Sequence, residues 1–424
     1  MQHSVSKVVL TNGAEGLFID VPSASVTSID IVFRAGDYLS PAGKTDTAHV
    51  LEHMVLGANK KYPTAKLFSR EFTKHGAYNN AYTGDYHMGY EAECEASESE
   101  RIIDLLCVAI ESPLFAQADF DAEIGNVREE LKMRRNNDDN ELTLSLENAM
   151  GFIVKSYRER AKELPAITLR DIERHYTKTH ASRNMRFVIA GPIAQYADKI
   201  KQRLTALAIQ VGDEYIPLPT ESPQRLTVPF VMHNDNLDNV CYRWEVALPA
   251  FASYLQQDSL SALQDILFSG FHSRVFGELR EKGLVYGIFG GFYETKDHAV
   301  NAISGQVQAE NIYEVFKILL RELQDIASKG VTTQELDELK KRVFGELQRY
   351  HQTPSQLINW YRSPFIAKGE LVYFDSLSQR IDAITNESIM QATQQLLASN
   401  IAGLGVMHNK AEPVDAKRLF NMVG

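Results

Sequence analysis

The first half of the chain contains short segments in which apolar and polar residues alternate, and longer segments in which apolar residues recur at helical spacing. Residues 26–33 alternate and are rich in β-branched side chains, which predicts a strand. Residues 99–111 repeat apolar side chains at helical spacing, which predicts a helix that ends before Pro113. Further strands are expected at 8–10, 17–21, 78–82, 86–93 and 185–190, and further helices at 47–56, 66–75, 120–135 and 169–180.

The second half repeats the element order of the first. A proline-rich stretch without periodicity, 213–229, separates the halves and is predicted to be a linker between domains 1–212 and 230–424. Strands are expected at 239–248, 286–293, 299–307 and 403–407, and helices at 260–268, 312–328, 333–350 and 386–399. Two α+β halves of similar length and order indicate an internal duplication.

Composition narrows the class of protein. The chain of 424 residues is 44% hydrophobic and 23% charged, as in ordinary globular proteins. Its net charge of −11 argues against nucleic-acid binding, which requires a basic surface. The three cysteines have no CxxC spacing, so neither a disulfide framework nor a thiolate zinc site is indicated. No apolar run is long enough to span a membrane and no leader segment is evident, so we expect a cytoplasmic protein.

The segment from His49 to His53 carries the most specific chemistry. On a helix, residues four apart share one face, so His49 and His53 can reach the same metal ion. Glu52 borders that face and can touch a water on the metal without being a ligand. The order His-x-x-Glu-His is the inverzincin motif, and a catalytic zinc site needs a third protein ligand from another element.

The predicted helix 120–135 offers three candidates for the third ligand. Glu123 and Glu130 lie seven residues apart and share a helix face, whereas Glu129 is rotated away from it. Apolar residues border the shared face, which indicates that it points inward: Ile124, Val127 and Leu131. A buried carboxylate is costly unless it is paired or binds a metal, although the alternative of solvated surface charges stays open from spacing alone.

These features together resemble the M16 metallopeptidases, the family of insulin-degrading enzyme and mitochondrial processing peptidase. His49, Glu52 and His53, followed by Glu130, match the zinc motif of the family. The resemblance extends over nearly the whole chain through 62–63, 80–83, 113–115, 273–276 and 279–287. It is strongest with the short two-domain bacterial members. It implies an α+β fold of two homologous α/β-sandwich halves of the LuxS/MPP type, each a mainly antiparallel sheet packed with helices.

The resemblance also implies roles for residues in the first half. His49, His53 and Glu130 would bind Zn²⁺, and Glu52 would be the general base on the zinc-bound water. Glu123 would orient a ligand histidine. The strand that holds Asn80, Ala81, Tyr82 and Thr83 would bind the substrate backbone as an added strand. The pair Asp46-Thr47 stands before Ala48 and His49 where the family more often has a glycine, a change expected to alter the helix cap and not the ligands.

In the second half, the resemblance points to Arg280 and Tyr286, which would reach the substrate, with Tyr286 donating to the oxyanion. Their separation of six residues is one shorter than is common in the family. The second half has no zinc motif, so one Zn²⁺ per chain is expected.

The predicted function is that of a zinc endopeptidase that cleaves unfolded peptides inside a chamber. The predicted partners are a peptide substrate and a second M16 chain, as a homodimer or a heterodimer. Two alternatives stay open, an active subunit that needs a non-catalytic partner and a non-catalytic assembly subunit. An acidic run is interpreted either as a solvated strand end or as a chamber wall that favours basic peptides: Glu91, Glu93, Glu95, Glu98 and Glu100.

Overall fold

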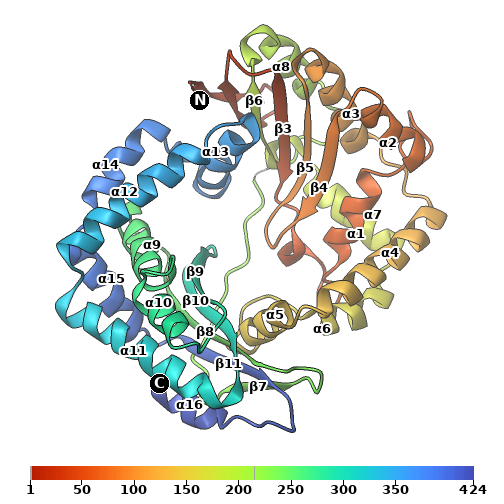
Figure 1. Cartoon of the computed structure of the whole chain (residues 1–424). Helices are drawn as coiled ribbons and strands as arrows, with labels where there is room; N and C mark the ends of the chain where they lie inside the picture. The colour runs from red at the N-terminus through yellow and green to blue at the C-terminus, as the bar shows by residue number, and fades with distance from the viewer. Residues whose placement is uncertain (1, 214) are drawn as a thin grey trace. The chain divides into compact units, whose positions relative to one another are not determined.

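The computed structural model describes residues 2–213 and 215–424, which form two compact units (Figure 1). The first unit contains the chain up to Lys132, Arg158–Pro219 and Gln348–Val372. The second contains Met133–Tyr157, Thr220–Leu347 and Tyr373–Gly424. Residue 1 of the first predicted domain and residue 214 of the predicted linker lie outside the described residues.

A six-stranded sheet forms the centre of the first unit, in the order β1-β2-β6-β3-β5-β4. Only the β2–β6 pair is parallel among these neighbours. The alternating residues 26–33 form a central strand, as the pattern predicts, and β4 lies at one edge. The strands are β1 (Ser4–Val9), β2 (Glu15–Asp20), β3 (Val26–Phe33), β4 (Tyr78–Thr83), β5 (Met88–Glu95) and β6 (Met185–Gly191).

Helices cover the two faces of this sheet differently. On one face, α13 (Pro354–Lys368) packs Leu357 and Tyr361 against Val32 and Val188, forming a buried apolar cluster. The other helices come from the first half of the chain, and of these α1 contacts β4 and α7 while α3 contacts β5. Their bounds are α1 (Thr47–Val55), α2 (Ala65–Thr73), α3 (Ser99–Glu111), α4 (Gln117–Arg135), α6 (Tyr157–Glu163), α7 (Leu169–Thr179) and α8 (Ala197–Thr205).

The second unit repeats the strand order in a five-stranded sheet, β7-β11-β8-β10-β9. Among the described residues, the one parallel pair of this sheet is β7–β11, which corresponds to β2–β6 in the first sheet. The strands are β7 (Phe230–His233), β8 (Val240–Pro249), β9 (Ile288–Glu294), β10 (His298–Val307) and β11 (Ala402–His408). The helices are α5 (Asp138–Met150), α9 (Tyr254–Phe268), α10 (Arg274–Glu281), α11 (Ile312–Lys329), α12 (Thr333–Arg349), α14 (Leu377–Ala383), α15 (Asn386–Ala398) and α16 (Ala416–Val423).

Each sheet is partly covered by a helix from the other half of the sequence. Helix α13 lies late in the chain but packs on β6 and β3 of the first sheet. Helix α5 lies early in the chain but packs on β11 and β8 of the second sheet. The compact units are therefore not the contiguous segments 1–212 and 230–424, and the predicted division of the sequence at 213–229 stays a prediction.

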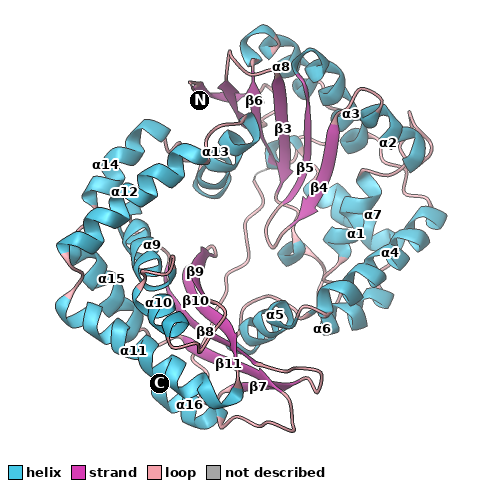
Figure 2. Cartoon of the chain, viewed as in Figure 1, coloured by secondary structure: helices cyan, strands magenta, loops and turns pink. Residues whose placement is uncertain are grey.

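The observed architecture confirms the predicted fold class, two mainly antiparallel sheets packed with helices (Figure 2). The pattern did not predict several elements, among them α5, α10, α13 and the short strand β7. Helix α13 contains Pro364 in its interior, which ordinarily argues against a helix, and it is instead supported by a Thr353–Gln356 capping box. No helix in the described part of the chain is long and apolar enough to cross a membrane.

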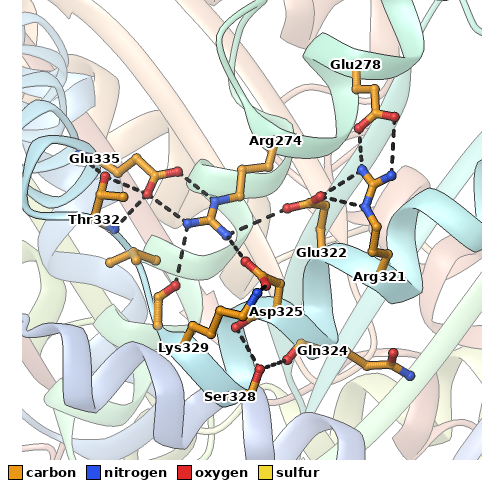
Figure 3. Close-up of polar contacts among 12 residues, drawn as sticks. Arg274, Glu278, Arg321, Glu322, Gln324, Asp325, Ser328, Lys329, Thr332 and Glu335 are labelled. Carbon is orange, nitrogen blue, oxygen red and sulfur yellow. Dashed lines mark hydrogen bonds and ion pairs between the residues drawn. The ribbon is translucent and has the colours of Figure 1, made fainter.

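A charge network joins three helices of the second unit (Figure 3). Arg274 at the start of α10 donates to both carboxylate oxygens of Glu335 on α12, at 2.6 and 2.8 Å. It also reaches Asp325 and Glu322 on α11, at 3.3 and 3.6 Å. The Arg274 side chain is 15% exposed, so this network is shielded from water more than a surface ion pair is.

Candidate metal centre

Helix α1 presents two histidines on one face. Val50, Leu51 and Met54 are buried and fix the helix against the rest of the unit. His49 and His53 are one turn apart on the remaining face, with ring centroids 4.9 Å apart and planes at 88°. Both rings therefore direct a nitrogen toward the same small volume.

Helix α4 brings a carboxylate to this volume. Glu130 Oε2 lies 3.3 Å from His49 Nε2 and 3.8 Å from His53 Nε2. One donor atom from each residue lies within 4.8 Å of the others, and no other such group of three occurs in the described part of the chain. Two imidazole nitrogens and one carboxylate oxygen are a donor set that catalytic zinc sites use, so these residues fit Zn²⁺.

The second nitrogen of each histidine faces its own carboxylate. His49 Nδ1 lies 3.2 Å from Asp46 Oδ1, and His53 Nδ1 lies 2.9 Å from Glu123 Oε2. A neutral imidazole that donates from Nδ1 keeps the lone pair on Nε2, the atom that faces Glu130. Both carboxylates thus select the tautomer that a metal ligand needs.

Asp46 is itself fixed by an arginine from α6. Arg160 donates to both oxygens of Asp46, at 2.6 and 3.1 Å, and also lies 3.1 Å from Asp37. Burial alone would raise the pKa of Asp46, but the hydrogen bonds from His49 and Arg160 outweigh it and lower that pKa to about 2. The Asp46 side chain makes no cap hydrogen bond, so the expected effect on the cap is replaced by a contact with His49.

The environment of His49 favours positive charge when no metal is bound. Burial acts to lower the pKa of His49, but the hydrogen bonds with Asp46 and Glu130 outweigh it and raise that pKa to about 9. At Glu123, the hydrogen bond with His53 lowers the carboxyl pKa. The surrounding carboxylates therefore favour positive charge at His49, carried by a proton when no metal ion is bound.

Glu52 lies between the histidines and the edge of the sheet. Its Oε2 accepts a hydrogen bond of 2.7 Å from Thr83 Oγ1, at the end of β4. Thr83 pairs with Met88 of β5, which fixes the hydroxyl relative to α1. The interaction links the predicted base directly to the predicted substrate strand, a link that neither segment reveals by itself.

The predicted substrate strand is an edge strand. β4 pairs with β5 and with no other strand in the described chain, so one row of its backbone groups has no strand partner. Alternate side chains project to opposite faces. Thr83 and Ala81 lie on the α1 face, whereas Asn80 donates to Glu91 at 3.3 Å and Tyr82 donates to Asp30 at 3.1 Å on the α13 face.

Arg280 and Tyr286 belong to the second compact unit, whereas the other predicted site residues belong to the first. The Arg280 guanidinium donates to Val285 O at 3.2 Å and lies over the Tyr286 ring, 5.4 Å from its centroid. Tyr286 is 91% exposed, and both residues line a cavity of about 620 Å³. Their contact with a substrate stays a prediction.

Comparison with known families decides the relationship. Residues 17–156 match the family model described as "Insulinase (Peptidase family M16)", and residues 166–343 match "Peptidase M16 inactive domain". The chain belongs to the M16 peptidase family. The first match contains His49, Glu52, His53 and Glu130, and the second contains the segment with Arg280 and Tyr286.

Individual M16 relatives are distant. An "uncharacterized zinc protease" of Streptomyces coelicolor is 22% identical over 441 residues, covering 100% of this chain and 94% of that protein. Protease 3 of Escherichia coli strain K12 is 33% identical over 129 residues, 30% of this chain, and the match spans only 13% of Protease 3. The crystal structure of a protease from Helicobacter pylori has a TM-score of 0.85 at 18% identity, covering 96% of this chain and 100% of that one. This last similarity shows the fold alone.

Proposed function

We propose that this M16 chain is a zinc-dependent endopeptidase that cleaves unfolded peptides, with one zinc ion per chain. The observation that carries the proposal is the convergence of His49, His53 and Glu130 with both Nδ1 atoms engaged by carboxylates. A surface cluster of histidines and acids would not need this paired orientation. The zinc-protease name of the Streptomyces relative agrees with the donor set.

Zinc, when bound, supplies a Lewis acid that polarises the scissile carbonyl and makes a nearby water more acidic. The chain supplies the proton transfers. Glu52 accepts a proton from the attacking water as its oxygen bonds to the carbonyl carbon, and passes that proton to the leaving amine as the C–N bond breaks. The Thr83 hydroxyl holds the Glu52 carboxylate in place during both transfers.

The open edge of β4 positions the substrate peptide. An extended peptide can pair with the open backbone groups of β4, as a further strand of the sheet. Thr83 marks the end of β4 nearest to Glu52, so pairing brings the backbone of the peptide to the base. Pairing requires an extended chain, which favours unfolded peptides over folded proteins.

The proposal is tested by zinc content and by peptide cleavage with the same purified protein. Wild type is expected to hold one zinc per chain by mass spectrometry and to cleave a mixture of unfolded peptides, with loss of cleavage on chelation and recovery with added zinc. Glu52→Gln is expected to keep the zinc and to lose cleavage by at least about a thousandfold. A wild type that holds zinc but needs a second M16 chain for cleavage would support the heteromeric alternative, and one that neither holds zinc nor cleaves would refute the proposal.

A further inference from the structure

A second cavity lies on the α13 face of the first sheet, beside β4. Its volume is about 330 Å³, and strands β3, β4 and β5 form its floor while α13 forms its wall. It is entirely within the first unit. The lining includes Asp30, Tyr78, Glu91, Glu93 and Arg362. The cavity lies on the face of β4 opposite to Thr83 and the histidines of α1.

The charges that line the cavity do not balance. Arg362 donates to Asp30 at 2.8 Å, so this guanidinium is already paired with a carboxylate that is 2% exposed. Glu91 and Glu93 are half-buried on β5. Glu91 accepts a hydrogen bond from the neutral Asn80 side chain at 3.3 Å, and Glu93 accepts one from the neutral Ser28 hydroxyl at 2.8 Å. Three carboxylates against one guanidinium leave the cavity negative. A partly desolvated negative cavity attracts a cationic side chain.

The register of the sheet connects this cavity to a bound peptide. Tyr78 opposes Glu93 and Asn80 opposes Glu91 in the β4–β5 pairing, so the two glutamates lie on the face shared by alternate residues of β4. A peptide paired with the outer edge of β4 continues the same pleat. Every second side chain of that peptide then projects toward the cavity, while the others project toward α1.

We infer that this cavity is a specificity pocket for a lysine or arginine side chain of the substrate, held by Glu91 and Glu93. This inference rests on the proposed function. Thr83, at the catalytic end of β4, is five residues from Tyr78. Asn80 and Tyr78, which oppose Glu91 and Glu93, are three and five residues from Thr83. The basic side chain of a paired peptide therefore lies roughly two to five residues from the cleaved bond. The inference also gives the first two glutamates of the acidic run a purpose that the sequence left open.

The test uses quenched fluorescent peptides of neutral sequence in which a single lysine is moved along the chain. Each is compared with a peptide that has norleucine, a neutral side chain of similar length, at the same position. Wild type is expected to show kcat/KM about tenfold higher with lysine at one or two alternate positions, as for a partly desolvated ion pair. In the double variant Glu91→Gln, Glu93→Gln that ratio is expected to fall to about one.

Two further variants make the result specific. The matched control Glu95→Gln, Glu100→Gln removes two charges from the same acidic run but outside the cavity, and is expected to keep the lysine preference. Glu91→Lys is expected to shift the preference toward glutamate at the same positions. Thermal melting and zinc content establish that each variant is folded.

Binding separates this inference from the proposed function. In zinc-loaded Glu52→Gln, fluorescence anisotropy measures the affinity for lysine and norleucine peptides without turnover, and about a tenfold difference is expected. If wild type cleaves peptides but lysine has no effect, or if the effect survives Glu91→Gln, Glu93→Gln, the pocket is refuted and the peptidase stands. If wild type cleaves nothing while Glu52→Gln prefers lysine peptides through Glu91 and Glu93, the pocket stands and the peptidase is refuted.

Discussion

At the scale of single residues, the two proposed ligand histidines differ in how they are held. His49 is nearly buried, and its carboxylate partner Asp46 is in turn fixed by Arg160. His53 is 24% exposed, and its partner Glu123 contacts Asn126 of the same helix. Water can replace a lost partner more easily at His53 than at His49. The two carboxylates should therefore contribute unequally to metal affinity.

The change Asp46→Asn is expected to weaken zinc binding by about ten- to a hundredfold, because the amide removes the charge that supports His49. Glu123→Gln is expected to weaken it less, since solvent reaches His53. Competition with a chromophoric chelator measures both affinities on proteins that circular dichroism shows to be folded. Equal affinity of Asp46→Asn and wild type would contradict this role for Asp46.

Thr83→Val removes the hydroxyl that donates to Glu52 while keeping the size of the side chain. We expect kcat to fall about tenfold, the effect of a hydrogen bond to a charged group, with KM and zinc content unchanged. Thr83→Ser keeps the donor and should restore most of the rate. Steady-state kinetics with one peptide would show the split, and a change confined to KM would mean that Thr83 acts on substrate binding.

At the scale of elements, strong periodicity predicts helices and strands more reliably than it predicts where they pack. Helices α1 and α4 could be predicted from the sequence, and the resemblance to the M16 family singled out the four candidate residues that they carry, His49, Glu52, His53 and Glu130. Asp46 and Arg160 could not be predicted, because their interaction joins positions more than a hundred residues apart. Helix α13 was missed because an internal proline hides a helix that tertiary packing supports.

Two arginines of the second unit allow a direct comparison of shielded and exposed charge. Arg274 is 15% exposed among three carboxylates, whereas Arg321 is 52% exposed beside Glu278 and Glu322 (Figure 3). Arg274→Met is expected to lower the free energy of unfolding by about 2 kcal/mol, since it leaves shielded carboxylates without a cation. Arg321→Met should cost less than about 1 kcal/mol. Urea denaturation measures both, and a larger loss for Arg321→Met would contradict the argument.

Two buried histidines of the first unit predict how stability depends on pH. Burial lowers the pKa of His175 to about 4 and that of His180 to about 3. The unfolded chain, with histidine pKa values near about 6.5, therefore binds protons first as the pH falls, and the folded state loses stability below about pH 6.5. At pH 5 we expect a loss of roughly 1–2 kcal/mol per histidine relative to pH 7.

The measurement is urea denaturation at several pH values in the presence of a chelator, so that loss of metal does not contribute. His175 Nε2 donates a hydrogen bond of 2.8 Å to Ala35 O, and His175→Gln can still donate to that carbonyl without titrating. The variant is expected to show a shallower dependence on pH between 7 and 5. An unchanged slope would show that His175 is not one of the groups responsible.

At the scale of the whole molecule, the compact units are built from both halves of the sequence. Family resemblance predicts two related sheets, and their matching strand orders agree with that prediction. The reciprocal placement of α5 and α13 could not be predicted from patterning, since the strands that each helix contacts lie in the other half of the sequence. The boundaries 1–212 and 230–424 stay a prediction about related halves of the sequence. The compact units differ from them, because α13 packs in the first unit and α5 in the second.

The reciprocal placement of α5 and α13 predicts what happens when the chain is divided at the predicted linker. A fragment 1–212 lacks α13 and exposes an apolar face that includes Leu17, Ile19, Val32 and Val188. It is expected to bind a hydrophobic dye strongly and to aggregate, while co-expression with fragment 213–424 should restore a soluble pair. Sedimentation and dye fluorescence measure this, and a stable, monomeric fragment 1–212 would contradict it.

The exchanged helices also bear on how a gene of this kind can change. Because each half of the sequence supplies a helix that covers the sheet of the other half, a break between the halves would yield two products that depend on each other for folding. Both would have to be made together, in matched amounts, before either could mature. The reciprocal placement of α5 and α13 therefore favours keeping the two halves on one polypeptide.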